Sequence, residues 1–468
     1  MALRSASQAL ALLLAPPLGQ AQEQGRSPAL RRQCETPILQ EVLPTTLDQA
    51  QLQAWNDIDL PGQAPWEMHM DALSDYWDRC ARHGGRLWEV PDAQNSNSAV
   101  GVCMHRSCSQ RQVERRLLPR PNGVAIGMAF ELGHWRQLHL DFVLAGYAKC
   151  GTSSLSHNLA RHTQVNFIPA APEDPEVNKD DQEAQDGDFF WYNGNRLLPL
   201  VQLIDAFNEG RCCNHGTGVS IAEDNATKEK WHGGLLVRGE RNPVYAFHRL
   251  IMRMIKMVPR AKIILIACDP IGWLHSSYAD TTTWYSPAEM EGLAPPPPLA
   301  AFASTDMVEV EKVAQPLLGH WYNLSRRHGC QSRMFEGLIR LLGGQTALPR
   351  VHLLHRDSVD ERLVGGEAVR KAYNRLAEFL GVSPFPASFD FQRRNTAGEL
   401  VGKSRQRQTT QKKISDLCGP SEAQALQKLR HYYRGEYARM PALLERFGSP
   451  VPARVAANRT YCDPWLHS

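Results

Sequence analysis

The sequence lacks any apolar run of the ~20 residues that a bilayer-spanning helix requires, so we expect no stable membrane span. It also lacks an excess of one charge, because 52 Lys and Arg residues stand against 49 Asp and Glu residues, for a formal net charge of +3. So small a charge does not indicate nucleic acid as a partner, although it allows a local basic site for an anionic ligand. Internal repeats are missing too. The 468-residue chain, with 43% hydrophobic and 22% charged residues, is long enough for about two to three domains.

The N-terminus has the features of a targeting segment. It predicts a secretory signal peptide over residues 1–21, because Arg4 is followed by an apolar run from Ala9 to Leu18 and by the small-x-small site Gly19-Gln20-Ala21. The first 22 residues contain no acid, which leaves an organellar transit peptide, or a signal anchor, as the alternative. We therefore expect the chain in the secretory pathway, in the Golgi lumen or secreted. Golgi membrane association and an organelle are the other locations.

Eleven cysteines are typical of a secreted, partly disulfide-bonded chain, and their odd number leaves at least one thiol without an intramolecular partner. Residues 22–136 form an N-terminal extension that contains several Trp and Cys residues. Cys103 and Cys108, with His105 between them, have the spacing of half a zinc site. No second ligand pair follows, so we expect a disulfide-braced extension instead. Three sequons permit N-glycosylation in the secretory pathway, at Asn225, Asn323 and Asn458.

Apolar runs of strand length alternate with amphipathic segments from Gln137 onward. Strands are expected within 138–146, 165–168, 219–222, 262–268 and 351–355, and helices over 152–162, 244–258 and 367–380. Strands that are apolar on both faces and alternate with helices indicate an α/β domain with a mainly parallel central sheet flanked by helices. We place this domain at residues 137–450, followed by a C-terminal tail over residues 451–468.

A glycine-containing loop joins the first of these strands to its helix. The run AGYAKCGTSSL, Ala145 to Leu155, combines Gly146 and Gly151 with Lys149 and three hydroxyl residues. Glycines allow close backbone approach, hydroxyls can cap the helix, and the N–H groups of a helix start bind anions. The loop is not a Walker A motif, in which Lys directly follows the second Gly. It is therefore suited to a phosphate or phosphosulfate, the alternative being a plain strand–turn–helix with a solvated lysine.

The segment GYAKCGTSSL resembles the 5′-phosphosulfate loop of sulfotransferases that use 3′-phosphoadenosine 5′-phosphosulfate (PAPS). It is most similar to the carbohydrate (heparan-sulfate type) branch, whose loop reads Gly-x-x-Lys-x-Gly-Thr-Thr/Ser-x-Leu. The resemblance covers roughly residues 137–447 and implies a P-loop-like sulfotransferase fold, PAPS as co-substrate and no required metal. The co-substrate contacts that it implies are Lys149, Cys150, Gly151, Thr152, Ser153 and Ser154.

A second segment, AKIILIACDPIGWLHSSY, resembles the family's 3′-phosphate segment, an apolar strand followed by Arg-x-Pro-x-x-Arg-x-x-Ser-x-Tyr. Ser276 falls in register and is implied as a co-substrate contact. Cys268 and Trp273 occupy the two arginine positions, and the first of these arginines is a 3′-phosphate ligand in the family.

The missing charge has a candidate source near the C-terminus. The run GKSR is similar to a basic family loop that reaches the 3′-phosphate, so we predict that Lys403 or Arg405 supplies the charge. Two further segments are weaker matches to the family, VSIAEDNAT from Val219 and LAEFLGV from Leu376.

The general base that takes the acceptor's proton is expected in an acidic segment, Glu173 to Asp188. We expect the strand at 165–168 to lie beside the loop strand, so that the chain after it leaves the sheet at the carboxyl edge, where ligands bind. Similarity to a Lys-Glu pair of the resembled branch favours Lys179 and Asp180 within this segment. The alternative is a solvated acidic loop. His157, which we expect to be structural, is then the next candidate.

Together these expectations describe a sulfotransferase that moves the sulfuryl group of PAPS to a hydroxyl acceptor, with carbohydrate favoured and tyrosine-containing proteins or small alcohols open. One alternative is an ATP-dependent kinase or other phosphate-transfer enzyme, with Asp269 as a magnesium ligand. Another is a non-catalytic descendant that binds a nucleotide or a glycan, motivated by the absent arginines.

Overall fold

The structure is a computed structural model. It describes residues 33–47, 65–92, 98–118, 127–146, 150–167, 190, 196–208, 237–241, 249–273, 331–392, 427 and 429–449. The chain divides into two compact units. The first comprises Met1–His139, Gly187–Glu223 and His248–Pro259, and the second comprises Leu140–Asp186, Asp224–Phe247 and Arg260–Ser468.

The first unit contains an antiparallel sheet with the strand order β1-β3-β2-β4. Its strands are β1 (Leu43–Pro44), β2 (Gly85–Pro91), β3 (Ala99–His105) and β4 (Phe130–Leu132). Its helices are α4 (Pro65–Arg82), α5 (Gln110–Leu117), η3 (Trp135–Gln137), α8 (Val201–Asn208) and α10 (Arg249–Met257). Strands β2 and β3 pair along their whole length, and both bury their central residues, which therefore form much of this unit's core.

Two disulfides join the segments of the first unit. Cys34 is bonded to Cys108 and Cys80 to Cys103, so the cysteines of the suggested half zinc site belong to two different disulfides. The prediction of a disulfide-braced extension is confirmed for these four residues. Small domains gain stability from such bonds because the bonds restrict the unfolded chain.

The second unit is built on a parallel sheet, which in the described part of the chain has five strands in the order β6-β7-β5-β8-β9. The strands are β5 (Phe142–Gly146), β6 (Val165–Phe167), β7 (Val237–Arg241), β8 (Lys262–Ala267) and β9 (Val351–His355). Every residue of β5 and β9 is buried, as is all of β8 beyond Lys262. Strands whose sequences have no polar face are expected to be buried on both sides, as these are. The predicted α/β class is confirmed.

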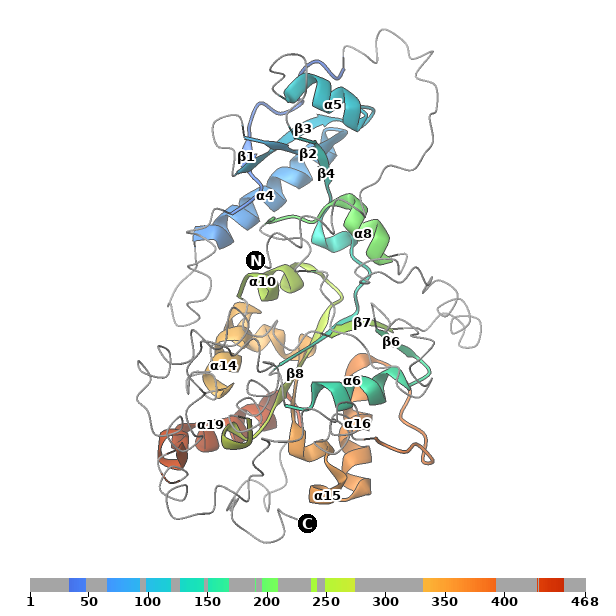
Figure 1. The fold of residues 1–468 in the computed structure, drawn as a ribbon, viewed down its shortest axis with the longest axis vertical. Helices are drawn as coiled ribbons and strands as arrows, with labels where there is room; N and C mark the ends of the chain where they lie inside the picture. Colours follow the sequence, from blue (N-terminus) through green and yellow to red (C-terminus); the bar gives the residue numbers. More distant parts are fainter. Residues whose placement is uncertain are drawn as a thin grey trace, which may run out of the picture. The chain divides into compact units, whose positions relative to one another are not determined.

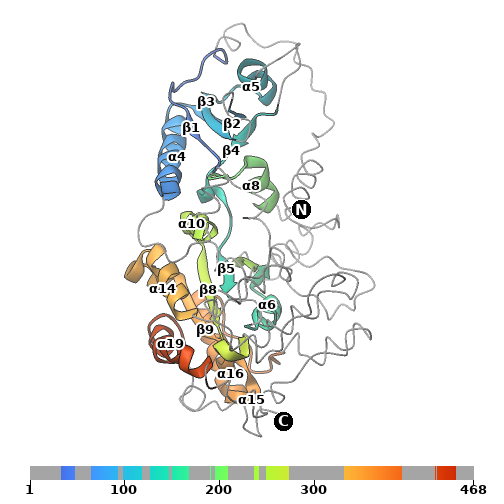
Figure 2. The same cartoon turned by 60° about the vertical axis from the view of Figure 1, so that its left-hand side comes forward.

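Helices cover both faces of this sheet. The helices are α6 (Thr152–Ala160), α14 (Gln331–Leu341), α15 (Glu361–Val364), α16 (Gly366–Leu380) and α19 (Arg434–Phe447), with the short η7 (Gly344–Arg350) and η8 (Arg356–Val359). In Figures 1 and 2, α6 and α16 lie on one side of the strands and α14 and α19 on the other. Because all five strands are parallel, their carboxyl ends meet at one edge, where the β5–α6 loop begins.

One expectation about the sheet is wrong. The strand predicted at 165–168 exists as β6, but it pairs with β7 and not with the loop strand β5. Strand β7 takes the place beside β5 instead. Its sequence, VRGER, is too charged to be recognised as a buried strand, so no local pattern indicated a strand between β5 and β6. The strand predicted at 219–222 lies outside the described residues.

In the part of the chain that the structure describes, no helix is both long and apolar enough to cross a membrane.

Candidate functional site

The loop between β5 and α6 starts with a close approach of two strands. Gly146 is paired with Ile266 of β8. A Cβ atom built on Gly146 would lie 2.7 Å from Ile266 Cγ2 and 2.9 Å from the backbone N and O of that residue. The φ of Gly146 is +154°, which also disfavours a side chain. Glycine therefore lets the chain leave β5 tightly packed against its neighbour.

Helix α6 begins at a second glycine in the left-handed conformation. Gly151 is the N-cap residue, with φ 90° and ψ 20°, and no side chain caps the helix. The expected capping by hydroxyls is therefore wrong: Thr152, Ser153 and Ser154 lie inside the first turn. Thr152 is buried, whereas Ser153 and Ser154 are half-buried. A first turn whose N–H groups have no side-chain cap suits an anionic group, which those N–H groups and the positive end of the helix dipole attract.

A disulfide fixes the loop to the neighbouring strand end. Cys150, directly before the N-cap residue, is bonded to Cys268, the first residue after β8, with 5.2 Å between their Cα atoms. Cys150 has no exposed surface and Cys268 only 5%. The side chain of Cys150 is therefore occupied, and only its backbone remains for the predicted co-substrate contact. The sequence did not reveal this pairing, because connectivity cannot be deduced from cysteine positions alone.

Gln331, the first residue of α14, holds the end of β8 and the disulfide in place. Its Oε1 accepts a hydrogen bond from the backbone N of Cys268 at 3.0 Å. Its Nε2 lies 3.9 Å from Sγ of Cys150 and 3.8 Å from Sγ of Cys268. Gln331 itself is 1% exposed. The disulfide is thus enclosed by protein rather than displayed on the surface.

Asp269 is engaged in structural hydrogen bonds. Its Oδ2 accepts from the backbone N of Gly272 at 2.7 Å, and its Oδ1 accepts from the hydroxyl of Tyr437 at 2.9 Å. Both carboxylate oxygens therefore have donors, and the residue is 6% exposed. These bonds give Asp269 a structural role at the end of β8, and each carboxylate oxygen keeps a lone pair that a metal ion could use. Among the described residues, no cluster of three or more His, Cys, Asp or Glu side chains could hold a metal ion.

Beside Asp269, α19 also holds the start of α14. Glu436 accepts hydrogen bonds from the backbone N of Ser332 at 2.7 Å and from its Oγ at 2.6 Å. Burial raises the pKa of Glu436, and these two bonds oppose the shift. Helices α14 and α19 are therefore joined by hydrogen bonds, and together they hold the residues that follow β8.

An arginine that the sequence analysis missed lies at the carboxyl end of β7. Arg241 pairs with Leu144 of β5, is 7% exposed, and its Nη1 donates to Oγ of Ser156 in α6 at 3.0 Å. A buried guanidinium beside the loop helix adds positive charge to this edge of the sheet. The available signal was weak, since only the apolar run Leu235-Leu236-Val237 precedes the charged residues of β7.

The far side of α6 is locked by hydrogen bonds. Asn158 Nδ2 donates to the hydroxyl of Tyr373 at 2.9 Å and to the carbonyl of Gln392 at 2.8 Å. Burial raises the pKa of Tyr373, so this phenol stays neutral. His157 is 4% exposed and its Nε2 lies 3.0 Å from Oε1 of Gln392, as expected for a structural histidine. These contacts fix the axis of α6 and hence the direction of its N-terminus.

Several predicted site residues lie outside the described residues, and their roles stay predictions. They are Lys149, Lys179, Asp180, Ser276, Lys403 and Arg405. Those that the structure does bring together are Cys150, Gly151, Thr152, Ser153 and Ser154, at the start of α6.

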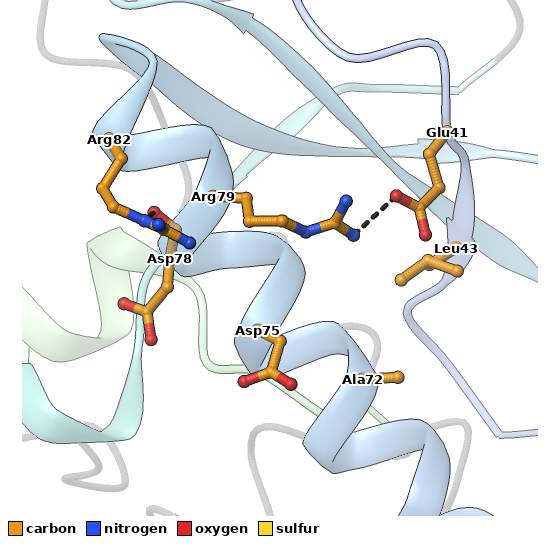
Figure 3. A pocket seen from close by; sticks show the side chains of 7 residues that line it. All are labelled: Glu41, Leu43, Ala72, Asp75, Asp78, Arg79 and Arg82. Atoms are coloured by element: carbon orange, nitrogen blue, oxygen red, sulfur yellow. Dashed lines mark hydrogen bonds and ion pairs between the residues drawn. The ribbon is translucent and has the colours of Figure 1, made fainter.

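The first unit has a separate surface hollow beside α4 (Figure 3). Its lining includes Glu41, Asp75, Asp78, Arg79 and Arg82. Arg79 Nη2 and Glu41 Oε2 lie 2.5 Å apart, with both side chains about two-fifths exposed. Asp78 forms an ion pair with Arg136 outside the hollow. Exposed pairs of this kind contribute little free energy, and they leave the hollow without a distinctive chemistry, so we assign no site there.

No family model and no curated protein sequence matches the chain. Among solved structures, it is similar to a sulfotransferase from Alicyclobacillus acidocaldarius, with 16% identity over 68% of this chain and 99% of that chain, at a TM-score of 0.36. It is also similar to a sulfotransferase domain from the curacin biosynthetic pathway, with 13% identity over 62% and 98% and a TM-score of 0.28. A third similar structure is a sulfotransferase domain from the Synechococcus PCC 7002 olefin synthase, with 13% identity over 67% of this chain and 98% of that chain, at a TM-score of 0.26. Scores this low do not assign the chain to a family.

Proposed function

We propose that this chain is a sulfotransferase that transfers the sulfuryl group of PAPS to a hydroxyl acceptor, with a carbohydrate favoured. The observation that carries the proposal is the β5–α6 loop. It joins a buried parallel strand to a helix whose N-cap is a left-handed glycine without a side-chain cap, at the carboxyl edge of the sheet. Ligands of open parallel sheets bind at this edge, and helix starts of this kind bind phosphate groups.

The chemistry suits a transfer that needs positioning and charge more than covalent catalysis. In-line transfer of a sulfuryl group leaves negative charge on the departing 5′-phosphate. The N–H groups of the first turn of α6, together with Lys149, would stabilise that charge. Lys179 or Asp180 would take the proton of the acceptor hydroxyl. Arg241 would add positive charge from β7, and no metal takes part.

Three disulfides among the described residues support a secretory location, because such bonds persist in oxidising compartments. We propose the Golgi lumen or the secreted pool, where carbohydrate acceptors are present.

One observation favours a second candidate, a nucleotide-binding protein without transfer activity. Cys268 stands where the resembled family has a 3′-phosphate arginine, and it is tied into a buried disulfide. A half-cystine cannot donate charged hydrogen bonds to a phosphate. This candidate predicts nucleotide binding without transfer.

The test is a transfer assay with radiolabelled PAPS and a panel of acceptors: desulfated glycosaminoglycans, tyrosine peptides and small alcohols. We expect label on at least one hydroxyl acceptor. Lys149→Ala should reduce turnover by at least ~100-fold, the usual loss when one preorganised charge is removed. Lys371→Ala, at an exposed lysine of α16, is the matched control and should leave turnover unchanged. Binding of the nucleotide with no transfer to any acceptor would favour the second candidate.

A further inference from the structure

Arg356 lies at the same edge of the sheet as the β5–α6 loop. It directly follows β9 and begins η8. The last pair of the β8–β9 ladder is Ala267 with His355, so Arg356 is level with Cys268, the residue disulfide-bonded to the loop. The register thus puts Arg356, just past the end of β9, beside the residue after β8 to which the loop is attached.

The side chain of Arg356 packs against the N-cap residue of α6. A Cβ atom built on Gly151 would lie 3.4 Å from Cγ of Arg356, 3.6 Å from its Cδ and 4.0 Å from its Nε. The aliphatic part of the arginine therefore covers the open face of the glycine. The start of the guanidinium therefore lies beside the N-cap residue of α6. The contact restricts the rotamers of a long side chain, which lowers the entropy cost of using it in binding.

The charge of Arg356 has no hydrogen-bonded or ion-paired partner among the residues that the structure describes. The nearest carboxylates along the chain and across the ladder are engaged elsewhere. Asp357 Oδ2 lies 3.3 Å from Nδ1 of His355, and both oxygens of Asp269 accept hydrogen bonds. Arg356 is half-buried rather than fully solvated. A partly desolvated guanidinium beside a helix start suits a phosphate oxyanion, which it can bind through two parallel N–H donors.

We propose that Arg356 is a binding residue for the anionic nucleotide, donating to a phosphate group seated at Gly151. This inference rests on the proposed function, because the nucleotide is its ligand. Arg356 and Arg241 would bring positive charge to the loop from opposite sides, because Arg356 follows β9 whereas Arg241 belongs to β7. The nucleotide has a 3′-phosphate and a 5′-phosphate, and either group has the oxyanions that Arg356 would bind. The binding experiments below distinguish the two.

The experiment measures dissociation constants by calorimetry for wild type, Arg356→Ala and Arg356→Lys. The ligands are 3′-phosphoadenosine 5′-phosphate, adenosine 5′-phosphate and inorganic phosphate. Arg362→Ala is the matched control, since its side chain is 66% exposed and pairs with Asp360. We expect Arg356→Ala to weaken bisphosphate binding about 10- to 100-fold, the share of a charge-assisted hydrogen-bonded pair. Arg356→Lys should recover part of the affinity, and the melting temperature without ligand should stay unchanged.

Each outcome has one meaning. Weaker binding of both nucleotides places the contact at the 5′-phosphate, and weaker binding of the bisphosphate alone places it at the 3′-phosphate; both support the inference. Unchanged binding of all three ligands, or an equal loss in Arg362→Ala, overturns it while the proposed function stands. If wild type binds inorganic phosphate through Arg356 but neither nucleotide, the anion contact stands and the proposed function fails. If wild type binds none of the ligands, both fail.

Discussion

Removal of the Cys150–Cys268 disulfide should weaken nucleotide binding and lower stability together. The bond closes a loop of 118 residues. Restriction of the unfolded chain by a loop of that length gives about 5 kcal/mol, the upper end of the usual range for one disulfide. We therefore expect Cys150→Ala/Cys268→Ala to lower the free energy of unfolding by about 2–5 kcal/mol.

The effect on binding has a different physical origin. The disulfide fixes the backbone directly before the N-cap of α6, and fixing one residue costs about 1–2 kcal/mol. Without the bond the nucleotide has to supply that ordering free energy, which corresponds to an affinity about 5- to 30-fold lower. Calorimetry with 3′-phosphoadenosine 5′-phosphate, well below the melting temperature of the variant, measures this loss.

The first unit offers a matched control for this experiment. Cys34→Ala/Cys108→Ala removes a disulfide that closes 74 residues, so it should lower stability by a similar amount. Its nucleotide affinity should stay at the wild-type value. Wild-type affinity in Cys150→Ala/Cys268→Ala, or equal losses of affinity in the two double variants, would refute the idea that the bond positions the loop.

Three further predictions concern charge at and around the sheet. Burial lowers the pKa of His352 from 6.5 to about 4, so protonation favours the unfolded chain, and stability is lost as pH falls from about 6.5 to about 4. In His352→Leu, the decrease in the free energy of unfolding between pH 7 and pH 4 should be smaller than in wild type by about 3 kcal/mol, as measured by urea unfolding at the two pH values. Arg241→Met should weaken nucleotide binding about 10-fold or more, with Arg241→Lys retaining part of it, because a buried charged donor is lost; equal affinities in the calorimeter would contradict this. Alanine at the true base, Lys179 or Asp180, should lower turnover ~100-fold with little change in nucleotide affinity, and full activity in both variants would exclude the pair.

The strands and the loop could be predicted because their signals are local. Strands β5, β8 and β9 are apolar on both faces, which burial in a parallel sheet accommodates, and each ends within one residue of its predicted end. Strand β5 is shorter than the run predicted from residue 138, because it begins at Phe142. The helix at 367–380 was predicted from its spacing and is observed as α16. The glycines of the β5–α6 loop follow from the conformations and close approaches that they permit.

What the sequence did not disclose depends on contacts between distant residues. Strand β7 is buried although it carries Glu240 and Arg241, and Arg241 donates a hydrogen bond to Ser156, which lies 85 residues earlier in the chain. Its insertion displaced β6 from the expected place beside β5. The Cys150–Cys268 pairing required the register of β8 against the loop, which no local pattern encodes.

The most direct test of the proposed function is calorimetry that compares 3′-phosphoadenosine 5′-phosphate with ATP and magnesium on the wild-type chain. A sulfotransferase site recognises the 3′-phosphate and needs no metal. We therefore predict binding of the bisphosphate at least about 10-fold tighter than binding of ATP, an energy difference of about 1.4 kcal/mol, with no change on adding or chelating magnesium. Magnesium-dependent binding of ATP, with no binding of the bisphosphate, would contradict the proposal.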